Sequence, residues 1–529
     1  MEPLKEPSVC GNHMRPAAWM TNSPKPYESV LVANRGEIAV RILKALRECG
    51  LRGIAIHNDI DRDGMHLEYA DNVEHLRGED LMSTYLSTEA IINAAKRTGA
   101  DAIHPGYGFL SERADFAKAV LESGLIWIGP PPEAIMLMGD KIRARESMIK
   151  AQVPVIPGRS ISISDGEDPL PQLATAAAEV GYPLLLKASA GGGGKGMRVV
   201  NEPKLLRTEY QAASREAIAA FGNGTVYVES LLGGARHIEI QIFADSHGNV
   251  IHLNERDCSL QRRHQKVIEE APSPAVDPEL REKMGIAAIQ AARAVNYEGA
   301  GTVEFLLSPQ KEFYFLEMNT RLQVEHPVTE LVTGLDLVHM QLMAAAGIEL
   351  QLSQDEVSLS GHAMEARIYA EDPSTGFLPS IGPIARFDTP VGPGVRVDSG
   401  VRKGDEVTTS FDPMLAKIIV HAPDRDSAIQ RLDQALSETI LHGVKSNIEF
   451  CREILNTETF RGPGVTTDYL EGRPPNQIQN EISTGLIEII ATAAERFGLN
   501  KSKGALIDNQ DNHSGHEYDP FTTLTKRFP

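Results

Sequence analysis

The stretch from Phe313 to Glu330, FYFLEMNTRLQVEHPVTE, carries more polar groups at alternating positions than a buried strand can hold without a ligand. Its first four residues are aromatic or aliphatic, which indicates a β-strand. Strand side chains alternate between two faces, so four residues are predicted to share one face: Phe313, Phe315, Glu317 and Asn319. The fold must therefore accommodate a carboxylate and an amide side by side.

A second apolar, β-branched run, Gly301–Leu307, has Glu304 at its centre. A hairpin between the two strands would bring Glu304 beside Glu317. Neighbouring carboxylates repel each other, and pairing them in a half-buried sheet becomes favourable when a hard divalent cation binds their oxygens. The sequence thus predicts a magnesium site for a nucleotide, and the alternative is a salt bridge in which Arg321 or Lys311 neutralises both carboxylates.

The composition indicates a globular chain without a membrane span. Its 529 residues suffice for several domains, and no apolar run reaches the length of a membrane helix. The net charge of −20 argues against a nucleic-acid partner, because phosphate backbones bind to basic surfaces. The four cysteines are far apart and form no CxxC pair, so they indicate neither a zinc site nor a disulfide framework, and a cytoplasmic location is expected.

Strands and helices alternate in the N-terminal part of the chain. After residues 1–26, which are expected to be a disordered extension, VLVAN reads as a buried strand and Gly36–Cys49 as an amphipathic helix. Repetition of this pattern predicts a doubly wound parallel sheet. Turns at Asn34–Gly36 and His104–Gly108 follow strand ends, where such sheets bind ligands, although shaping the turn is the simpler role for their glycines.

A glycine-rich loop lies between two strands in Tyr182–Val200, YPLLLKASAGGGGKGMRVV. It lacks the P-loop pattern, because its lysine is followed by glycine and not by Ser or Thr. It matches GxGxxG at Gly191, Gly193 and Gly196, but a dinucleotide loop should lead into a helix, and here a strand follows. We expect a hairpin flap that closes over phosphates, with Lys187 behind it, and the strong flanking strands argue against a disordered linker.

Two further stretches add polar groups to the predicted sheet. Arg236–Phe243 alternates isoleucines with polar residues on the opposite face, His237, Glu239 and Gln241, which predicts a half-exposed sheet. Asn254–Glu270 is dense in Arg and Lys within an acidic protein. A solvated charged surface is the usual explanation, and the alternative is a positive potential for phosphate and carbonate.

The C-terminal third is predicted to be an α+β module. Gly361–Ala370 places Arg367 on a strand, short strands continue to Val420, and a helix at Asp426–Thr439 closes the module. Residues 473–529 are polar and are expected to be a largely disordered extension.

Together these segments resemble the biotin carboxylase family of the ATP-grasp superfamily over residues 27–471. The resemblance implies an N-terminal α/β domain at 27–140, an ATP-grasp domain at 141–345 with a mobile lid at about 156–231, and an α+β module at 360–472. It rests on these motifs: ANRGEIAVRI at Ala33, HPGYGFLSE at His104, KASAGGGGKGM at Lys187, ERDCSLQRRHQK at Glu255, EMNTRLQVEHPVTE at Glu317 and EARIYAEDP at Glu365.

The resemblance implies a nucleotide site with Mg²⁺ or Mn²⁺, two ions in all. Nucleotide contacts would come from Lys141, Lys187, Gly191, Gly192, Gly193, Gly194, Gly196, Glu229, Leu231, His237 and His264. The metal ligands would be Glu304, Glu317 and Asn319. Ser230 stands where many relatives have lysine, but that contact is to the backbone.

The resemblance also implies the groups that act on bicarbonate and biotin. Arg321, Gln323 and Val324 match the bicarbonate site, and Tyr107 is placed among the bicarbonate and biotin contacts. Glu325 matches the general base, Lys266 the lysine over bicarbonate and phosphate, and Arg367 the residue that stabilises the biotin enolate.

The partners follow from one missing motif. Met-Lys-Met, the mark of a biotin carrier domain, does not occur in the sequence. We therefore expect a separate biotin carrier and carboxyltransferase subunits, with biotin as a carrier-bound substrate, and the family resemblance adds a homodimer. The alternatives are another ATP-grasp ligase, which would not need the RLQVEH and EARIYAEDP segments together, and a nucleotide-sensing relative, which would have lost the base or metal ligands.

Overall fold

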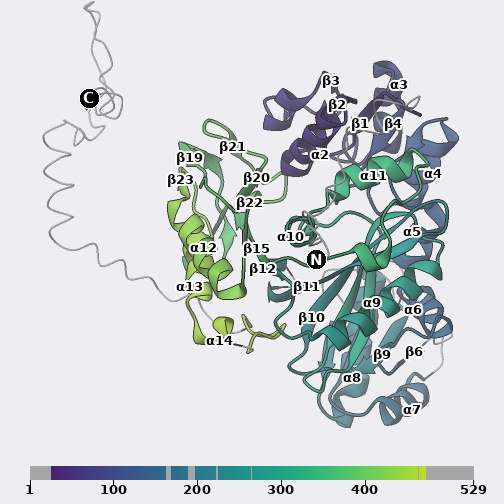
Figure 1. Cartoon of the computed structure of the whole chain (residues 1–529). Coiled ribbons are helices and arrows are strands. Elements are labelled where there is room, and N and C mark those ends of the chain that lie inside the picture. Colours follow the sequence, from purple (N-terminus) through teal and green to yellow (C-terminus); the bar gives the residue numbers. More distant parts are fainter. Residues whose placement is uncertain are drawn as a thin grey trace, which may run out of the picture. The chain divides into compact units, whose positions relative to one another are not determined.

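The computed structural model describes residues 26–161, 168–188, 197–221, 224–263, 265–462 and 464–471 (Figure 1). All of these belong to the first of two units, Met1–Pro475 and Asn476–Pro529. The predicted N-terminal extension up to residue 25, the flap glycines, His264 and the segment from residue 472 onward lie outside the described residues. Among the described helices, none has the length and apolarity needed to cross a bilayer.

The N-terminal region forms a five-stranded sheet in the order β3-β2-β1-β4-β5. Its strand pairs are all parallel. The strands are β1 (Ser29–Val32), β2 (Arg52–His57), β3 (Asn72–His75), β4 (Ala102–His104) and β5 (Ile126–Trp127). The helices are α2 (Gly36–Glu48), η1 (Met65–Tyr69), α3 (Thr88–Thr98), α4 (Ala114–Glu122) and α5 (Pro132–Gly139).

Helices cover both faces of this sheet. Val30 and Val32 of β1 share a buried cluster with Ile42 of α2. Leu31, between them, packs with Ile91 of α3 and Phe116 of α4 in a different cluster. Because strand neighbours point to opposite faces, the predicted doubly wound parallel sheet is confirmed.

The central sheet of the first unit has eight strands, in the order β14-β13-β10-β11-β12-β15-β22-β20. Its strands are β10 (Arg236–Ala244), β11 (Val250–Arg262), β12 (Gln265–Ala271), β13 (Gly299–Leu307), β14 (Phe313–Asn319), β15 (His362–Tyr369), β20 (Val395–Ser399) and β22 (Met414–Ala422). Helices α9 (Pro278–Arg293), α10 (His326–Thr333) and α11 (Leu337–Ala345) lie among them in the chain. Antiparallel pairing of β12 with β15 joins the two modules expected at 141–345 and 360–472 into one sheet.

The predicted hairpin of β13 and β14 is present, and Glu304 lies opposite Glu317. The prediction that Phe315 and Glu317 share a face is wrong. The register shifts between Glu304 and Phe305, so β14 contains an extra residue, and Met318 joins Phe315 in the apolar core. A β-bulge of this kind re-aims the side chains that follow it, which leaves Glu317 free to face the other side.

The half-exposed sheet predicted at Arg236–Phe243 is also wrong. The alternation itself is present, since the isoleucines of β10 lie in an apolar cluster. All of β10 is buried, however, including Glu239 and Gln241 at 0% exposure. The polar face is covered because Arg256 on β11, itself fully buried, bonds to both side chains.

The lid region has a sheet of its own in the order β6-β9-β7-β8. Its strands are β6 (Gly158–Ile161), β7 (Leu184–Ala188), β8 (Met197–Val200) and β9 (Val226–Ser230). Helices α7 (Leu170–Val180) and α8 (Leu206–Phe221) pack on it around a separate apolar core, with η2 (Pro203–Leu205) between strand and helix and α6 (Lys141–Lys150) before the lid. The antiparallel pairing of β7 with β8 confirms the strands that flank the glycine flap.

The C-terminal module adds short strands and helices around β15, β20 and β22. They are η3 (Gln354–Glu356), β16 (Glu371–Asp372), η4 (Pro373–Thr375), β17 (Leu378–Pro379), β18 (Gly382–Pro383), β19 (Arg386–Asp388), β21 (Glu406–Val407), α12 (Arg425–Glu438), β23 (Ile440–His442), α13 (Ile448–Leu455) and α14 (Glu458–Arg461). The predicted helix near 426–439 is confirmed as α12, but it does not close the module. Helix α13 buries Ile448, Cys451 and Leu455, whose spacing of three and four residues could have revealed it.

Candidate active site

A cavity of about 450 Å³ lies between the lid sheet and the central sheet, a size suited to a small-molecule ligand. Residues of α6, β7 and β9 line one part of it, and residues of β10, β13, β14 and β15 line another. Most of the predicted site residues with described positions line it: Lys141, Lys187, Glu229, His237, Lys266, Glu304, Glu317, Asn319, Arg321, Gln323, Val324, Glu325 and Arg367. Segments distant in the sequence therefore converge on one space.

Lys266 on β12 lies at the centre of a carboxylate cluster. Its Nζ donates to Glu239 Oε2 and Glu325 Oε1, each at 2.5 Å, and to Glu304 Oε1 at 3.1 Å. Burial lowers the pKa of Lys266, but the nearby acidic groups outweigh burial and hold that pKa well above its usual value. Lys266 is thus the cation that balances Glu304, in place of the Arg321 or Lys311 considered from the sequence. Arg321 pairs with Glu112 at 3.2 Å, and Lys311 contacts the Ala275 carbonyl.

The two carboxylates expected to bind metal differ in their surroundings. Glu304 is held by His237 Nε2 at 3.0 Å and by the side-chain amides of Asn319 at 2.8 Å and Gln323 at 2.9 Å. Glu317 has no hydrogen bond or ion pair within the described residues, and its exposed carboxylate faces the cavity. Desolvation by the surrounding protein and the negative charge of Glu304 both raise the pKa of Glu317. An unpaired carboxylate beside a second one fits a divalent cation with oxygen ligands.

Glu325 follows the end of β14 and immediately precedes α10. Its Oε2 accepts a hydrogen bond from Arg367 Nη2 at 3.0 Å, and its Oε1 accepts from Lys266. Arg367 also donates through Nε to Glu269 at 2.5 Å. Burial raises the pKa of Glu325, but Lys266, Arg367 and Arg256 outweigh burial and hold that pKa well below its ordinary value. A carboxylate, an ammonium and a guanidinium thus meet at one point of the cavity.

Arg256 of β11 supports this point from the same polar face of the central sheet. Its Nη2 donates to Gln323 Oε1 at 2.6 Å and to Thr302 Oγ1 at 3.0 Å, and its Nη1 donates to Thr329 Oγ1 at 3.0 Å. A fully buried guanidinium is tolerated only when its donors are satisfied. Arg256 lies within the basic run Asn254–Glu270, but the sequence pattern indicates no role for it, and only the pairing of β10 with β11 reveals one.

The lid and helix α6 before it contribute cations on the opposite wall. Lys187 of β7 forms an ion pair with Glu229 of β9, and these strands are antiparallel neighbours. Lys141 begins α6, whose N-cap is Asp140. Burial lowers the pKa of Lys141, and Glu317 opposes this change. Arg145 lies one helical turn after Lys141, lines the same cavity and was not predicted, although spacing by four residues on a helix is a usable signal.

Two predicted site residues do not line the cavity. Tyr107 donates a hydrogen bond to Glu37 of α2. Leu231 follows β9, and its backbone N–H donates to the Pro183 carbonyl at 3.3 Å. Other lining residues were missed, among them Tyr227, Gln261, Gln265, Tyr369 and Asp412. No local sequence motif identifies these residues, because only the pairing of distant strands and the course of the loops bring them to the cavity.

Comparison with known proteins agrees with this geometry. The family models "Biotin carboxylase, N-terminal domain", "Carbamoyl-phosphate synthase L chain, ATP binding domain" and "Biotin carboxylase C-terminal domain" match residues 26–135, 140–353 and 365–472. A biotin carboxylase of Halalkalibacterium halodurans is 49% identical over 444 residues, which cover 84% of this chain and 97% of the relative. Methylcrotonoyl-CoA carboxylase subunit alpha of Glycine max is 47% identical, and the match covers 88% of this chain but 64% of that protein.

Solved structures show the same fold. A Campylobacter jejuni biotin carboxylase in complex with β,γ-ATP has a TM-score of 0.80 and 44% identity, covering 84% of this chain and 98% of that one. The biotin carboxylase domain dimer of Hydrogenobacter thermophilus 2-oxoglutarate carboxylase, with MgADP, ADP and bicarbonate, has a TM-score of 0.80 and 45% identity, covering 85% and 98%. By this identity and coverage, the chain belongs to the biotin carboxylase family of ATP-grasp enzymes.

Proposed function

We propose that this chain uses ATP and bicarbonate to carboxylate biotin that is carried on a separate chain. The products are ADP, phosphate and carboxybiotin, and carboxyphosphate is the intermediate. One observation carries the proposal: Glu325 meets both Lys266 and Arg367 in a cavity that also contains the unpaired Glu317. This set joins a proton acceptor, two anion-binding groups and a cation site.

The phosphates of ATP would bind between Lys141, Lys187 and the central sheet. Glu304, Glu317 and Asn319 would hold Mg²⁺ or Mn²⁺, as two ions. The ions would neutralise charge on the phosphates during transfer. The flap glycines 191–194 and 196, Glu229, Leu231, His237 and His264 are proposed as further nucleotide contacts by the family resemblance.

Bicarbonate would bind against Arg321, Gln323 and the backbone of Val324. Glu325 would take the bicarbonate proton as the oxygen attacks the γ-phosphate, since bicarbonate is a poor nucleophile while protonated. Lys266 would neutralise the carboxyphosphate that forms. Its breakdown releases CO₂, and the leaving phosphate accepts the proton of the biotin ureido nitrogen. Arg367 would stabilise the enolate oxygen that results.

The assembly is proposed on the same basis. A separate biotin carrier, carboxyltransferase subunits and a second copy of this chain as a homodimer are the proposed partners. In support, one similar solved structure is a biotin carboxylase domain dimer, and one relative is named as subunit alpha of a methylcrotonoyl-CoA carboxylase. The proposal also includes three modules, at residues 27–140, 141–345 and 360–472. It further includes a cytoplasmic location.

The test is an ATP hydrolysis assay with purified chain, MgATP, bicarbonate and free biotin. Hydrolysis should require bicarbonate and rise with biotin. Free biotin should support slow turnover only, because a tethered ligand has a much higher effective concentration. Hydrolysis that ignores both compounds but responds to an amine or amino acid would instead assign the chain to a different group of ATP-grasp ligases.

A further inference from the structure

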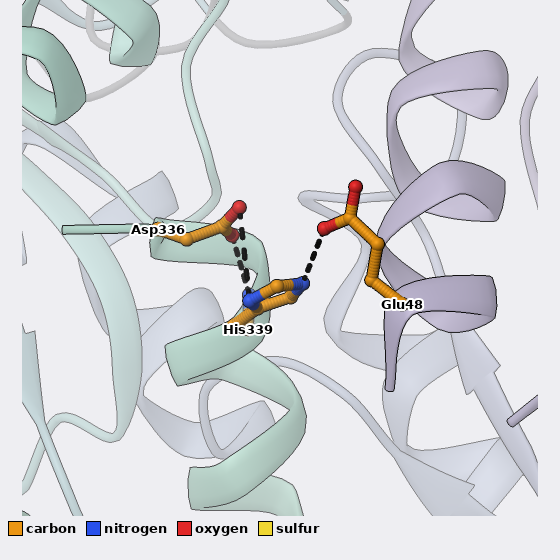
Figure 2. Close-up of side chains that lie close together, drawn as sticks. All are labelled: Glu48, Asp336 and His339. Carbon is orange, nitrogen blue, oxygen red and sulfur yellow. Dashed lines mark hydrogen bonds and ion pairs between the residues drawn. The ribbon is translucent and has the colours of Figure 1, made fainter. Parts of the chain in front are cut away.

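Outside the cavity, one cluster of side chains has the composition of a metal site. Glu48 of α2 and Asp336 at the N-terminus of α11 flank the ring of His339 (Figure 2). His339 Nε2 lies 3.2 Å from Glu48 and its Nδ1 lies 3.8 Å from Asp336. Asp336 is already engaged, however, because Oδ2 pairs with Arg41 at 2.8 Å and Oδ1 accepts the His339 backbone N–H at 2.8 Å. The Arg41 guanidinium thus already supplies the positive charge that a metal ion would bring to Asp336.

This cluster is the outer end of a chain of ion pairs that runs inward. Glu330 of α10 forms ion pairs with Arg41 at 2.9 Å and with Arg396 of β20 at 2.7 Å. Asp398 forms an ion pair with Arg396 at 2.8 Å and a second, longer one with Lys417 of β22 at 3.7 Å. The chain therefore connects α2, α10, α11 and two strands of the C-terminal module, and Lys417 is its inner end.

Lys417 is fully buried, with 0% exposure. Its Nζ donates to the carbonyl of Val324 at 2.7 Å and lies 3.3 Å from Glu37 Oε1. Glu37 in turn accepts the Tyr107 hydroxyl. A buried lysine is costly unless it is paired. Here the pairing directs one N–H to the backbone of the segment that precedes Glu325.

That segment, Arg321–Glu325, lies between β14 and α10 and belongs to neither. Strand hydrogen bonds therefore do not fix its backbone. Arg256 holds the Gln323 side chain, His326 Nδ1 lies 2.7 Å from the Gln323 carbonyl, and Lys417 holds the carbonyl of Val324. Lys417 is thus the link between this segment, the C-terminal module and, through Glu37, the N-terminal domain.

We propose that Lys417 is a positioning residue, whose hydrogen bond to the Val324 carbonyl sets the backbone of the bicarbonate site. Its pairing with Glu37 places Tyr107 relative to the same segment. This inference rests on the proposed function. Lys417 touches no reacting atom, so its loss should change bicarbonate use while leaving MgATP binding intact. A displacement of the order of 1 Å at a reacting group can reduce rates strongly.

The test compares Lys417→Met with wild type by steady-state ATP hydrolysis at varied bicarbonate and at varied ATP. The KM for bicarbonate should rise about tenfold or more, with the KM for ATP within about twofold of wild type. The substitution removes the cation beside Glu37, whereas Asp398 keeps its ion pair with Arg396. The double variant Lys417→Met/Asp398→Asn is measured in parallel because it restores the net charge of the network.

Arg396→Met is the matched control, because it removes a cation from the same network but has no bond to the 321–325 segment. It should lower Tm without changing the KM for bicarbonate. An unchanged bicarbonate KM in folded Lys417→Met, or an equal rise in Arg396→Met, would overturn the proposal. Failure of both Lys417 variants to fold would also overturn it, because the role would then be stability. A wild-type enzyme without bicarbonate dependence would instead overturn the proposed function.

Discussion

The Glu325 carboxylate and the Lys266 ammonium form a buried ion pair of 2.5 Å. Burial raises the pKa of Glu325, but this pair, with Arg367 and Arg256, holds it well below its ordinary value. A general base works best when its pKa lies near the working pH. If Glu325 is the base of the proposed reaction, an anion that draws Lys266 away from it would raise the pKa of Glu325 and make it a stronger base.

Lys266→Gln tests this coupling through the pH dependence of activity. Lys266 stabilises the ionised form of Glu325, so its removal should raise the pKa of Glu325 and move the acid limb of the kcat/KM profile to higher pH. Overall activity should also fall, because a charge near the phosphates is lost. The measurement is the residual bicarbonate-dependent hydrolysis between pH 5 and 9. An acid limb at the same pH, or at lower pH, would contradict the coupling.

Glu325→Gln should abolish bicarbonate-dependent ATP cleavage while leaving MgATP affinity nearly unchanged. The amide cannot accept the proton, but the phosphate and metal contacts remain. A general base contributes about 10²-fold or more to the rate. Turnover and nucleotide binding by calorimetry check the two parts separately. Activity above about a tenth of wild type would reject Glu325 as the base.

Glu317→Ala, unlike Glu325→Gln, should lose affinity for the metal–nucleotide complex. Glu317 has no protein partner in the described residues and faces the cavity, so its loss should weaken binding of Mg²⁺ and nucleotide rather than remove the base. Calorimetric titration with MgADP measures this. Glu312→Gln, on the exposed turn before β14, is a suitable control that should bind like wild type. Equal nucleotide affinity in Glu317→Ala would exclude Glu317 as a metal ligand.

The sequence predicted the parallel N-terminal sheet because strands and helices alternate there along the chain. It predicted the meeting of Glu304 with Glu317 because a short hairpin joins their strands. It could not predict the bulge that turns Met318 into the core, because a one-residue register shift leaves no mark on composition. The role of Arg256 was also hidden. Its partners Gln323 and Thr302 lie 67 and 46 residues away in the chain, and only the folded sheet brings them together.

Acid should destabilise the N-terminal domain through His104. This side chain is fully buried, and its Nδ1 accepts the Gly106 backbone N–H at 3.0 Å. Burial lowers the pKa of His104 to about 4. Between pH 6.5 and about 4, His104 is therefore protonated in the unfolded chain but neutral in the folded chain. The free energy of unfolding decreases as the pH falls through this range, by up to about 1.4 kcal/mol per pH unit. His104→Gln should show a smaller drop in Tm between pH 7.5 and 5.5 than wild type, and an equal drop would contradict this assignment.

Biotin is expected to enter the reaction on a separate carrier. The sequence has residues suited to carboxylating biotin but contains no Met-Lys-Met, so biotin ligase should not modify the expressed chain. Avidin should capture it only together with a biotinylated partner. Addition of that partner should raise turnover well above the rate with free biotin, because tethering raises the effective concentration of the ligand. The checks are an avidin blot of the purified chain and an ATPase assay with and without the partner. Covalent biotin on this chain, or a carrier that gives no more stimulation than free biotin, would contradict a separate-carrier mechanism.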